Sequence, residues 1–237
     1  MTFEDALQRD FPGAIPAITY VSWTQSALGR HGFSATSALA CLVMCSDELT
    51  DGLRQDLRRA WGSAFDAASL GGVPSLGRTG VAAAIGHAPL RSGRRRMVCF
   101  ALTHIGIGPE GQPGWCRRPG LEAPSEACGA LAALCRAAGQ ESCREGELDD
   151  PQLRWLAQRL DNYRPASDDS CLVELTRSAV AVAYEALRDL LAQVADLTAV
   201  DYALFSGVQV HGPSGREYVW PAQQLLVEQG VEKPLRP

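Results

Sequence analysis

The sequence predicts a single α/β domain built on a central, mostly parallel β-sheet that is flanked by helices. Three observations lead to this fold class: apolar runs of strand length at residues 37–45, 97–107 and 200–211, helical patterns between them, and glycine-rich segments at the strand ends. Continuous apolar runs are typical of strands buried on both faces of a parallel sheet. The 237 residues, 46% of them hydrophobic, suffice for one substantial core.

An N-terminal helix or arm is expected over residues 1–36. Phe3 to Asp10 has the pattern of a short amphipathic helix that ends before Pro12, and the stretch up to Gly32 is expected to be rich in loops. The α/β domain is then expected over residues 37–225. Residues 226–237 are expected to form a C-terminal tail.

The first apolar run ends at Cys45 and passes directly into a predicted helix. Ser46 can cap the start of this helix, and Asp47 and Glu48 place negative charge in its first turn. The apolar positions recur every fourth residue, so that one face packs on the core; they are Leu49, Leu53, Leu57 and Trp61. Cys45 is therefore expected at a strand-to-helix elbow.

Residues 69–80 are too rich in glycine for regular structure. Such a loop brings backbone N–H groups close to a small ligand, or it is simply a tight connection. It lacks the Gly-Lys-Ser/Thr ending of a phosphate loop, which argues against nucleotide binding.

The second strong strand carries His104 near its C-terminal end, and an irregular loop follows it. Cys128 then begins a predicted helix, where the helix macrodipole favours a thiolate. Further helices are predicted at about 151–160 and 171–195, as core or dimer-packing elements. A late strand is predicted at Val200–His211, with residues 217–220 returning as a short antiparallel partner.

Cys45, His104 and Cys128 each lie where a strand meets a loop or a loop meets a helix. Strand ends from different units converge at one edge of an α/β sheet, which is where ligands bind. Two thiolates and one imidazole leave a fourth zinc position open, as in a catalytic zinc site. The residues therefore predict a zinc lyase or hydrolase.

The remaining cysteines and histidines are expected to have structural roles rather than to bind metal. A single cysteine is more often a small buried apolar residue than a ligand, so Cys41, Cys99 and Cys135 are assigned to packing. The absence of Cys-x-x-Cys spacing argues against a structural zinc site and a redox protein. His211 is expected to be a hydrogen-bonded structural histidine, with a proton shuttle as the alternative.

Charge and composition exclude several function classes. The formal net charge of −5 offers no basic footprint for nucleic acid, and residues 94–96, all arginine, are interpreted as a solvated loop. No apolar run reaches the roughly 18 residues of a membrane span, and the acidic N-terminus does not resemble a secretory signal. A cytoplasmic protein without a disulfide framework is expected. One lysine against 21 arginines suggests a bacterial source with a GC-rich genome.

Six segments in order resemble the limiting-CO2-inducible B protein family, which is related to the theta and beta carbonic anhydrases. They are Cys45-Ser46-Asp47-Glu48-Leu49-Thr50, Ser75-Leu76-Gly77-Arg78-Thr79-Gly80, Thr103-His104-Ile105-Gly106-Ile107, Arg117-Arg118-Pro119-Gly120, Ala127-Cys128-Gly129-Ala130-Leu131 and Ser206-Gly207-Val208-Gln209-Val210-His211. The resemblance implies a beta-carbonic-anhydrase-like fold, a homodimer, and Zn2+ held by Cys45, His104 and Cys128. It further implies reversible hydration of CO2 to bicarbonate by hydroxide at the zinc, in inorganic-carbon concentration.

The sequence departs from this pattern beside Asp47, which is expected to orient the hydroxide, with ligation of the zinc in a closed state or simple stabilisation of the first helical turn as alternatives. Beta-class enzymes pair this aspartate with an arginine, whereas this chain has Leu49 and Ser46 at the two positions where an arginine is expected. Arg78 is the expected substitute.

Substrate binding is assigned to the segment that contains this arginine, namely Gly77, Arg78, Thr79 and Gly80. The alternative function is a catalytically silent, zinc-containing protein that binds bicarbonate or a partner. A zinc hydrolase acting on another small substrate is a second alternative.

Overall fold

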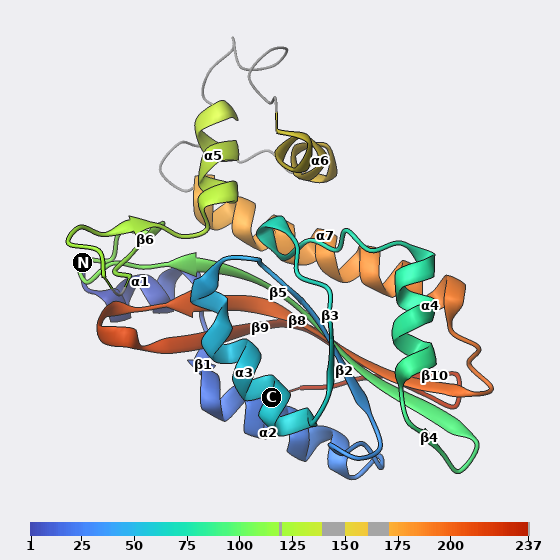
Figure 1. Ribbon diagram of the computed structural model, residues 1–237. Coiled ribbons are helices and arrows are strands. Elements are labelled where there is room, and N and C mark those ends of the chain that lie inside the picture. Colours follow the sequence, from blue (N-terminus) through green and yellow to red (C-terminus); the bar gives the residue numbers. More distant parts are fainter. Residues whose placement is uncertain (119, 139–149, 161–170, 237) are drawn as a thin grey trace.

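The structure is a computed structural model that describes residues 1–118, 120–138, 150–160 and 171–236 (Figure 1). Its centre is an eight-stranded sheet whose main path has the order β1-β9-β8-β5-β2-β3. Four adjacent strands are parallel to one another: the edge strand β3 (Ala64–Asp66), then β2 (Leu39–Met44), β5 (Arg94–Gly106) and β8 (Val200–His211). This confirms the predicted α/β class with a central, mostly parallel sheet.

Antiparallel strands extend the sheet beyond β8. The long strand β9 (Glu217–Glu228) pairs with β8, and β10 (Val231–Pro234) and β1 (Ile15–Pro16) both pair with β9. The short β4 (Leu90–Arg91) pairs with the start of β5. The predicted return strand at 217–220 therefore forms but is longer than expected, and the expected C-terminal tail supplies β10.

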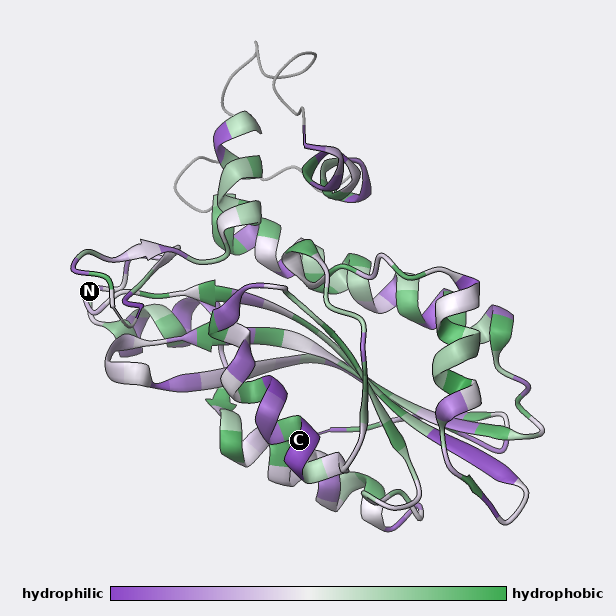
Figure 2. Ribbon diagram, viewed as in Figure 1, coloured by the Kyte–Doolittle hydropathy of each residue, from purple (hydrophilic) through white to green (hydrophobic). Residues whose placement is uncertain are grey.

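Helices cover both faces of the sheet (Figure 1). On one face lie α2 (Ala17–Gly29) and α3 (Asp51–Trp61), and on the other lie α4 (Arg78–His87) and α7 (Cys171–Val194). Side chains of β5 alternate between the two cores: Phe100 packs with the α2 and α3 side, and Cys99 with the α4 and α7 side. Figure 2 shows the resulting concentration of apolar residues in the inner strands.

The N-terminal segment is part of the main core. The predicted helix α1 (Phe3–Asp10) is confirmed, but the expectation of loops up to Gly32 is wrong because residues 17–29 form α2. The buried positions of α2 follow helical spacing; they are Ala17, Tyr20, Val21, Thr24, Ala27 and Leu28. Its aromatic and β-branched residues have low intrinsic helix propensity, so burial decides the structure. The domain division at residue 36 stays a prediction.

Three further helical elements stand at the end of the sheet where β2 and β5 finish (Figure 1). They are α5 (Gly129–Ala138), α6 (Pro151–Leu160) and the single 3₁₀ turn η2 (Leu70–Gly72). The short strands β6 (Trp115–Cys116) and β7 (Ser125–Glu126) pair beside them. The predicted helices α5, α6 and α7 are confirmed, whereas the glycine-rich segment 69–80 is more regular than expected because it contains η2 and the start of α4.

Gly72 explains why one glycine of this segment is required. It has a positive φ of 71°, and a Cβ atom there would lie 2.4 Å from the carbonyl oxygen of Leu102. Only glycine allows η2 to approach β5 this closely. The turn is thus held against the strand that carries His104.

Residues 94–96 belong to a strand rather than to the solvated loop that we expected. Arg94 begins β5, and its guanidinium donates to both carboxylate oxygens of Asp201 at 2.6 and 2.9 Å. The Asp201 side chain is only 2% exposed. A buried carboxylate needs such a partner, which accounts for arginine at this strand end.

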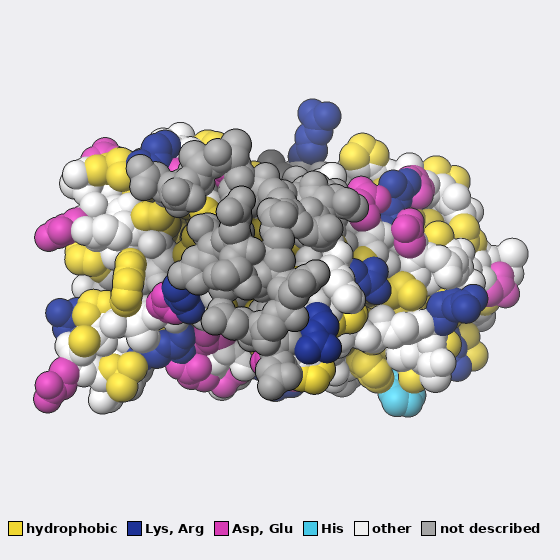
Figure 3. All heavy atoms as spheres, turned by 90° about the horizontal axis from the view of Figure 1, so that it is seen from above, with side chains coloured by type: hydrophobic (Ala, Val, Ile, Leu, Met, Phe, Trp, Pro, Cys, Tyr) yellow, Lys and Arg dark blue, Asp and Glu magenta, His cyan; other side chains and the backbone are white. Residues whose placement is uncertain are grey.

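The outer surface carries charges of both signs. Figure 3 shows acidic and basic side chains interspersed over the described part of one face. Among the residues that the structure describes, no helix has the length and apolar character needed to cross a bilayer.

Candidate metal centre

The structure brings the three predicted zinc ligands together. Cys45 directly follows β2, His104 lies near the end of β5, and Cys128 directly precedes α5. One ligand atom from each lies within 4.8 Å of the other two, and all three residues are buried. The two sulfur atoms are 3.7 Å apart. Parallel strand ends and a helix start thus converge as the sequence predicts.

The donor set fits a zinc ion. Nε2 of His104 is buried and has no hydrogen-bond partner, while Nδ1 of the same ring is engaged. A buried polar atom without a partner is costly, so this nitrogen calls for a ligand. Thiolates and imidazole are preferred zinc ligands, and three of them leave one coordination position for water or substrate.

The two thiols differ in their proton affinity. The hydrogen bond from Cys128 holds the pKa of the Cys45 thiol below its ordinary value, and the same contact together with burial raises the pKa of Cys128. The amides of Ala130 and Leu131 at the start of α5 act in the opposite direction on Cys128. One sulfur is therefore ready to ligate as a thiolate, and the helix start favours the second.

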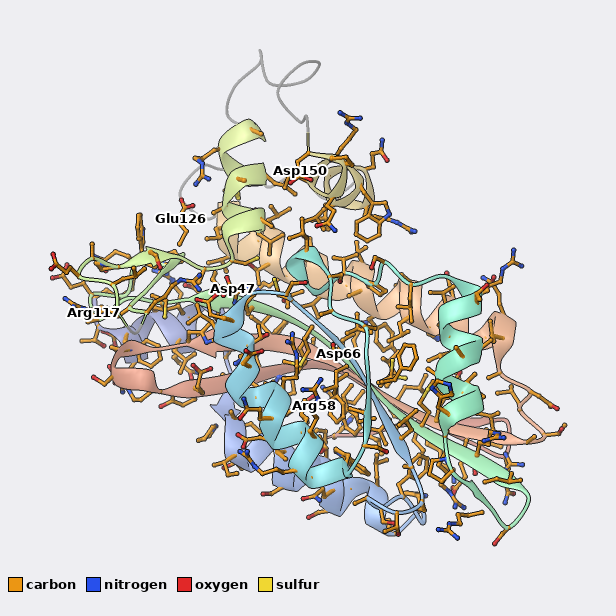
Figure 4. All side chains as sticks on the ribbon, viewed as in Figure 1. Asp47, Arg58, Asp66, Arg117, Glu126 and Asp150 are labelled. Carbon is orange, nitrogen blue, oxygen red and sulfur yellow. A yellow bond between two sulfur atoms is a disulfide. The ribbon has the colours of Figure 1, made fainter. Side chains whose placement is uncertain are left out.

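Asp47 lies beside the three ligands, where β2 ends and below α5 (Figure 4). Its Oδ2 is 3.8 Å from Nε2 of His104. Arg118 donates to both carboxylate oxygens, at 2.8 and 2.9 Å. Burial alone would raise the pKa of Asp47, but the hydrogen bonds from Arg118, the nearby His104 and the amide of Leu49 together outweigh it and hold that pKa below its usual range. The carboxylate is therefore ionised at neutral pH.

Arg118 is itself held in place by four groups. Besides Asp47, it donates to the hydroxyl of Ser125 at 2.7 Å and to the carbonyl oxygen of Glu126 at 2.9 Å, and it also contacts the Glu48 carboxylate. Because Arg118 is fixed in this way, its two hydrogen bonds to Asp47 restrict the orientation of the Asp47 carboxylate. The neighbouring Arg117 is exposed on the loop (Figure 4).

Two expectations about Asp47 are wrong. The partner is Arg118 and not Arg78, which is exposed at the start of α4. The cap of the following turn is Asp47 and not Ser46, because Oδ1 of Asp47 accepts from the amide of Leu49 at 3.1 Å. Arg118 lies in a loop far along the chain, and the only sequence signal for it is its place in the family-like segment 117–120.

The predicted substrate-binding residues lie apart from this cluster. Gly77 precedes α4, and Arg78, Thr79 and Gly80 form its first turn. Within the described ranges, no hydrogen bond or ion pair joins these four residues to the metal-binding side chains or to Asp47.

His211 is a further residue of the site. It is hydrogen-bonded and buried as expected, but its partner was not foreseen: its Nε2 lies 3.0 Å from Nδ1 of His104. Its Nδ1 lies 2.9 Å from Oε1 of Glu217. Burial lowers the pKa of His211 and favours the neutral ring. The signal was present in the sequence, since two predicted strands each carry a histidine near the same end.

The other cysteines divide into two groups. Cys41 and Cys99 are buried between β2, β5 and the α4 and α7 helices, which confirms their assignment to packing. The assignment of Cys135 to packing is wrong, because it forms a disulfide with Cys171 that joins α5 to the start of α7. Cys143 lies outside the described residues.

The fold and the three-residue cluster define an α/β protein with a candidate metal site. The model of the family described as limiting CO2-inducible proteins B/C beta carbonic anhydrases matches residues 14–228, and the chain belongs to this family. A comparison with curated protein sequences gives no match.

Solved structures agree with this assignment. The crystal structure of limiting CO2-inducible protein LCIB is 28% identical in sequence, with a TM-score of 0.77 over 97% of both chains. PtLCIB4, a homolog of LCIB, is 23% identical, with a TM-score of 0.83 over 98% of both chains, and this likeness shows the fold alone. The predicted family resemblance is confirmed.

Proposed function

We propose that this protein is a zinc-dependent carbonic anhydrase that catalyses the reversible hydration of CO2 to bicarbonate. Cys45, His104 and Cys128 would hold the ion. The observation that carries the proposal is the ion pair between Arg118 and Asp47 beside these ligands. It restores, from another part of the chain, the arginine that is missing at positions 46 and 49.

The chemistry that zinc supplies when bound is the activation of water as a nucleophile near neutral pH. Asp47 contributes an ionised carboxylate that accepts a hydrogen bond from the attacking oxygen and orients it. Because Arg118 donates to both of its oxygens, the carboxylate is held in one orientation beside the ligand set, with Oδ2 3.8 Å from Nε2 of His104. Arg118 thus acts through Asp47 as a positioning residue.

The surroundings of the two thiols suit a small neutral substrate. Cys45 and Cys128 share an apolar cluster with Val73, Leu131 and Leu156. Such a wall excludes water and accommodates CO2, which offers no charge for recognition. Residues 77–80 stay the proposed contact for bicarbonate, supported by the exposed Arg78 and by the uncapped start of α4.

The test is stopped-flow CO2 hydration by protein of known metal content, from about pH 6.5 to 9 around the expected water pKa of roughly 7. We expect about one zinc per chain, with loss of rate in Cys128→Ser. Cys116→Ser is the matched control, because Cys116 is also buried and free but lies outside the ligand cluster. Full zinc with no rate at any pH would contradict the proposal and favour the silent bicarbonate-binding alternative.

Four further expectations from the sequence stay predictions. They are the homodimer, the cytoplasmic location, the bacterial source and the role in carbon concentration. Light scattering of the purified protein tests the first of these.

A further inference from the structure

A buried row of three side chains extends from the candidate metal ligand His104 toward the surface. Nδ1 of His104 lies 3.0 Å from Nε2 of His211, and Nδ1 of His211 lies 2.9 Å from Oε1 of Glu217. His104 and His211 are 0% and 1% exposed, so water does not substitute for either contact. The Glu217 side chain is 33% exposed and ends the row.

The sheet itself builds this row. In the parallel pair of β5 and β8, His211 lies opposite Gly106, and in the antiparallel pair of β8 and β9 it lies opposite Glu217. The second oxygen of Glu217 accepts from Nε2 of Gln209 at 3.0 Å, which fixes the carboxylate. The two imidazole rings meet edge to face, at an interplanar angle of 79°.

With a metal on Nε2 of His104, only one arrangement of protons satisfies all of these contacts. If His104 binds the metal through Nε2, its ring proton must be on Nδ1, which then donates to Nε2 of His211. His211 must therefore accept at Nε2 and carry its own proton on Nδ1, and that proton is donated to Glu217. With the opposite tautomer of His211, two N–H groups would face each other in a buried site.

We infer that Glu217, acting through His211, fixes the tautomer of His104 and thereby the metal affinity of the site. Glu217 is a positioning residue in this scheme and touches neither metal nor substrate. The inference rests on the proposed function only in taking His104 as a ligand through Nε2. Groups that orient a ligating histidine typically change metal affinity about 10–100-fold when they are removed.

The experiment is a zinc competition assay with a chromophoric chelator on Glu217→Ala. We expect zinc affinity to fall about 10-fold or more. Glu228→Ala is the matched control, because Glu228 is also on β9 and lies 3.0 Å from a histidine, His31, that has no part in the site. An unchanged affinity in Glu217→Ala, or an equal loss in both variants, would overturn the inference.

A double-mutant cycle separates this role from general stabilisation. In His211→Gln, the amide oxygen can accept from Nδ1 of His104 without help from Glu217, so adding Glu217→Ala should no longer change the affinity. If the same loss persists in the His211→Gln background, Glu217 does not act through His211.

A spectroscopic measurement needs no variant for its main result. Nitrogen-15 NMR of the zinc-loaded wild-type protein should show the His211 proton on Nδ1, and a proton on Nε2 would refute the scheme. Zinc binding without CO2 hydration would remove the proposed function and leave this inference standing. Unchanged zinc affinity in Glu217→Ala, together with normal CO2 hydration, would refute this inference and leave the proposed function standing.

Discussion

Arg118 donates one hydrogen bond to each carboxylate oxygen of Asp47, although 71 residues separate the two in the sequence. The pair lies beside the ligand cluster, with Asp47 Oδ2 3.8 Å from His104 Nε2. A loop residue therefore supplies the charge partner that the strand-to-helix elbow lacks. The orientation of Asp47 therefore depends on how this loop is held.

Arg118→Ala is expected to lower the CO2 hydration rate by roughly 10–100-fold, the range found when a group that orients a metal-site residue is removed. The freed carboxylate loses its fixed orientation and can turn toward the ligand set. Zinc content should stay near that of the wild type, which atomic absorption measures. Arg117→Ala is the control, since its side chain is exposed in the same loop. A full rate in Arg118→Ala would show that Asp47 needs no partner.

The parts of the fold and of the candidate site that could be predicted from the sequence are those that local residue patterns determine. Strand β8 and helix α6 have the expected bounds because local apolar patterns determine them. The cluster of Cys45, His104 and Cys128 could be predicted because each residue lies next to such an element. Arg118 was missed, since a contact across 71 residues leaves no local pattern. The disulfide of Cys135 and Cys171 was also missed, since spacing alone does not reveal which cysteines meet.

Acid is expected to weaken the ion pair of Arg94 and Asp201. Burial alone would raise the pKa of Asp201, but the hydrogen bonds and charge of Arg94, the amide of Gln229 and the charge of Arg96 together outweigh it and hold that pKa below its ordinary value. A carboxyl whose folded pKa is lowered contributes stability above its unfolded pKa of about 3.9. That contribution is lost as the pH falls through the folded pKa.

Urea unfolding of wild type and Asp201→Asn at several pH values checks this expectation. At pH 7 the variant should be less stable by about 3 kcal/mol, as when one member of a buried pair is removed. The difference should shrink below about pH 4. Asp66→Asn, which breaks an exposed pair with Arg58, should have a small effect at every pH. A difference that does not vary with pH would contradict the assigned role of the charge.

Reduction of the disulfide is expected to destabilise the protein. Cys135 and Cys171 are 36 residues apart, and closing a loop of this size contributes roughly 3–4 kcal/mol in the chain-entropy model. Reductant should therefore lower the denaturation midpoint and expose two additional thiols. In Cys135→Ser with Cys171→Ser, the midpoint should be low from the start and insensitive to reductant. A thiol count that reduction leaves unchanged would show that this bond does not form.

The strands that carry the site are aligned at both of their ends. Arg94 and Asp201 pair where β5 and β8 begin, and His104 meets His211 near where they finish. Sliding one strand by a single residue turns every side chain to the opposite face, so it would break both contacts at once. The ion pair thus helps to fix the register of β5 and β8, on which the contact between His104 and His211 at the other end of the two strands depends. Anyone who transplants this centre into another scaffold must transfer the strand pairing with it.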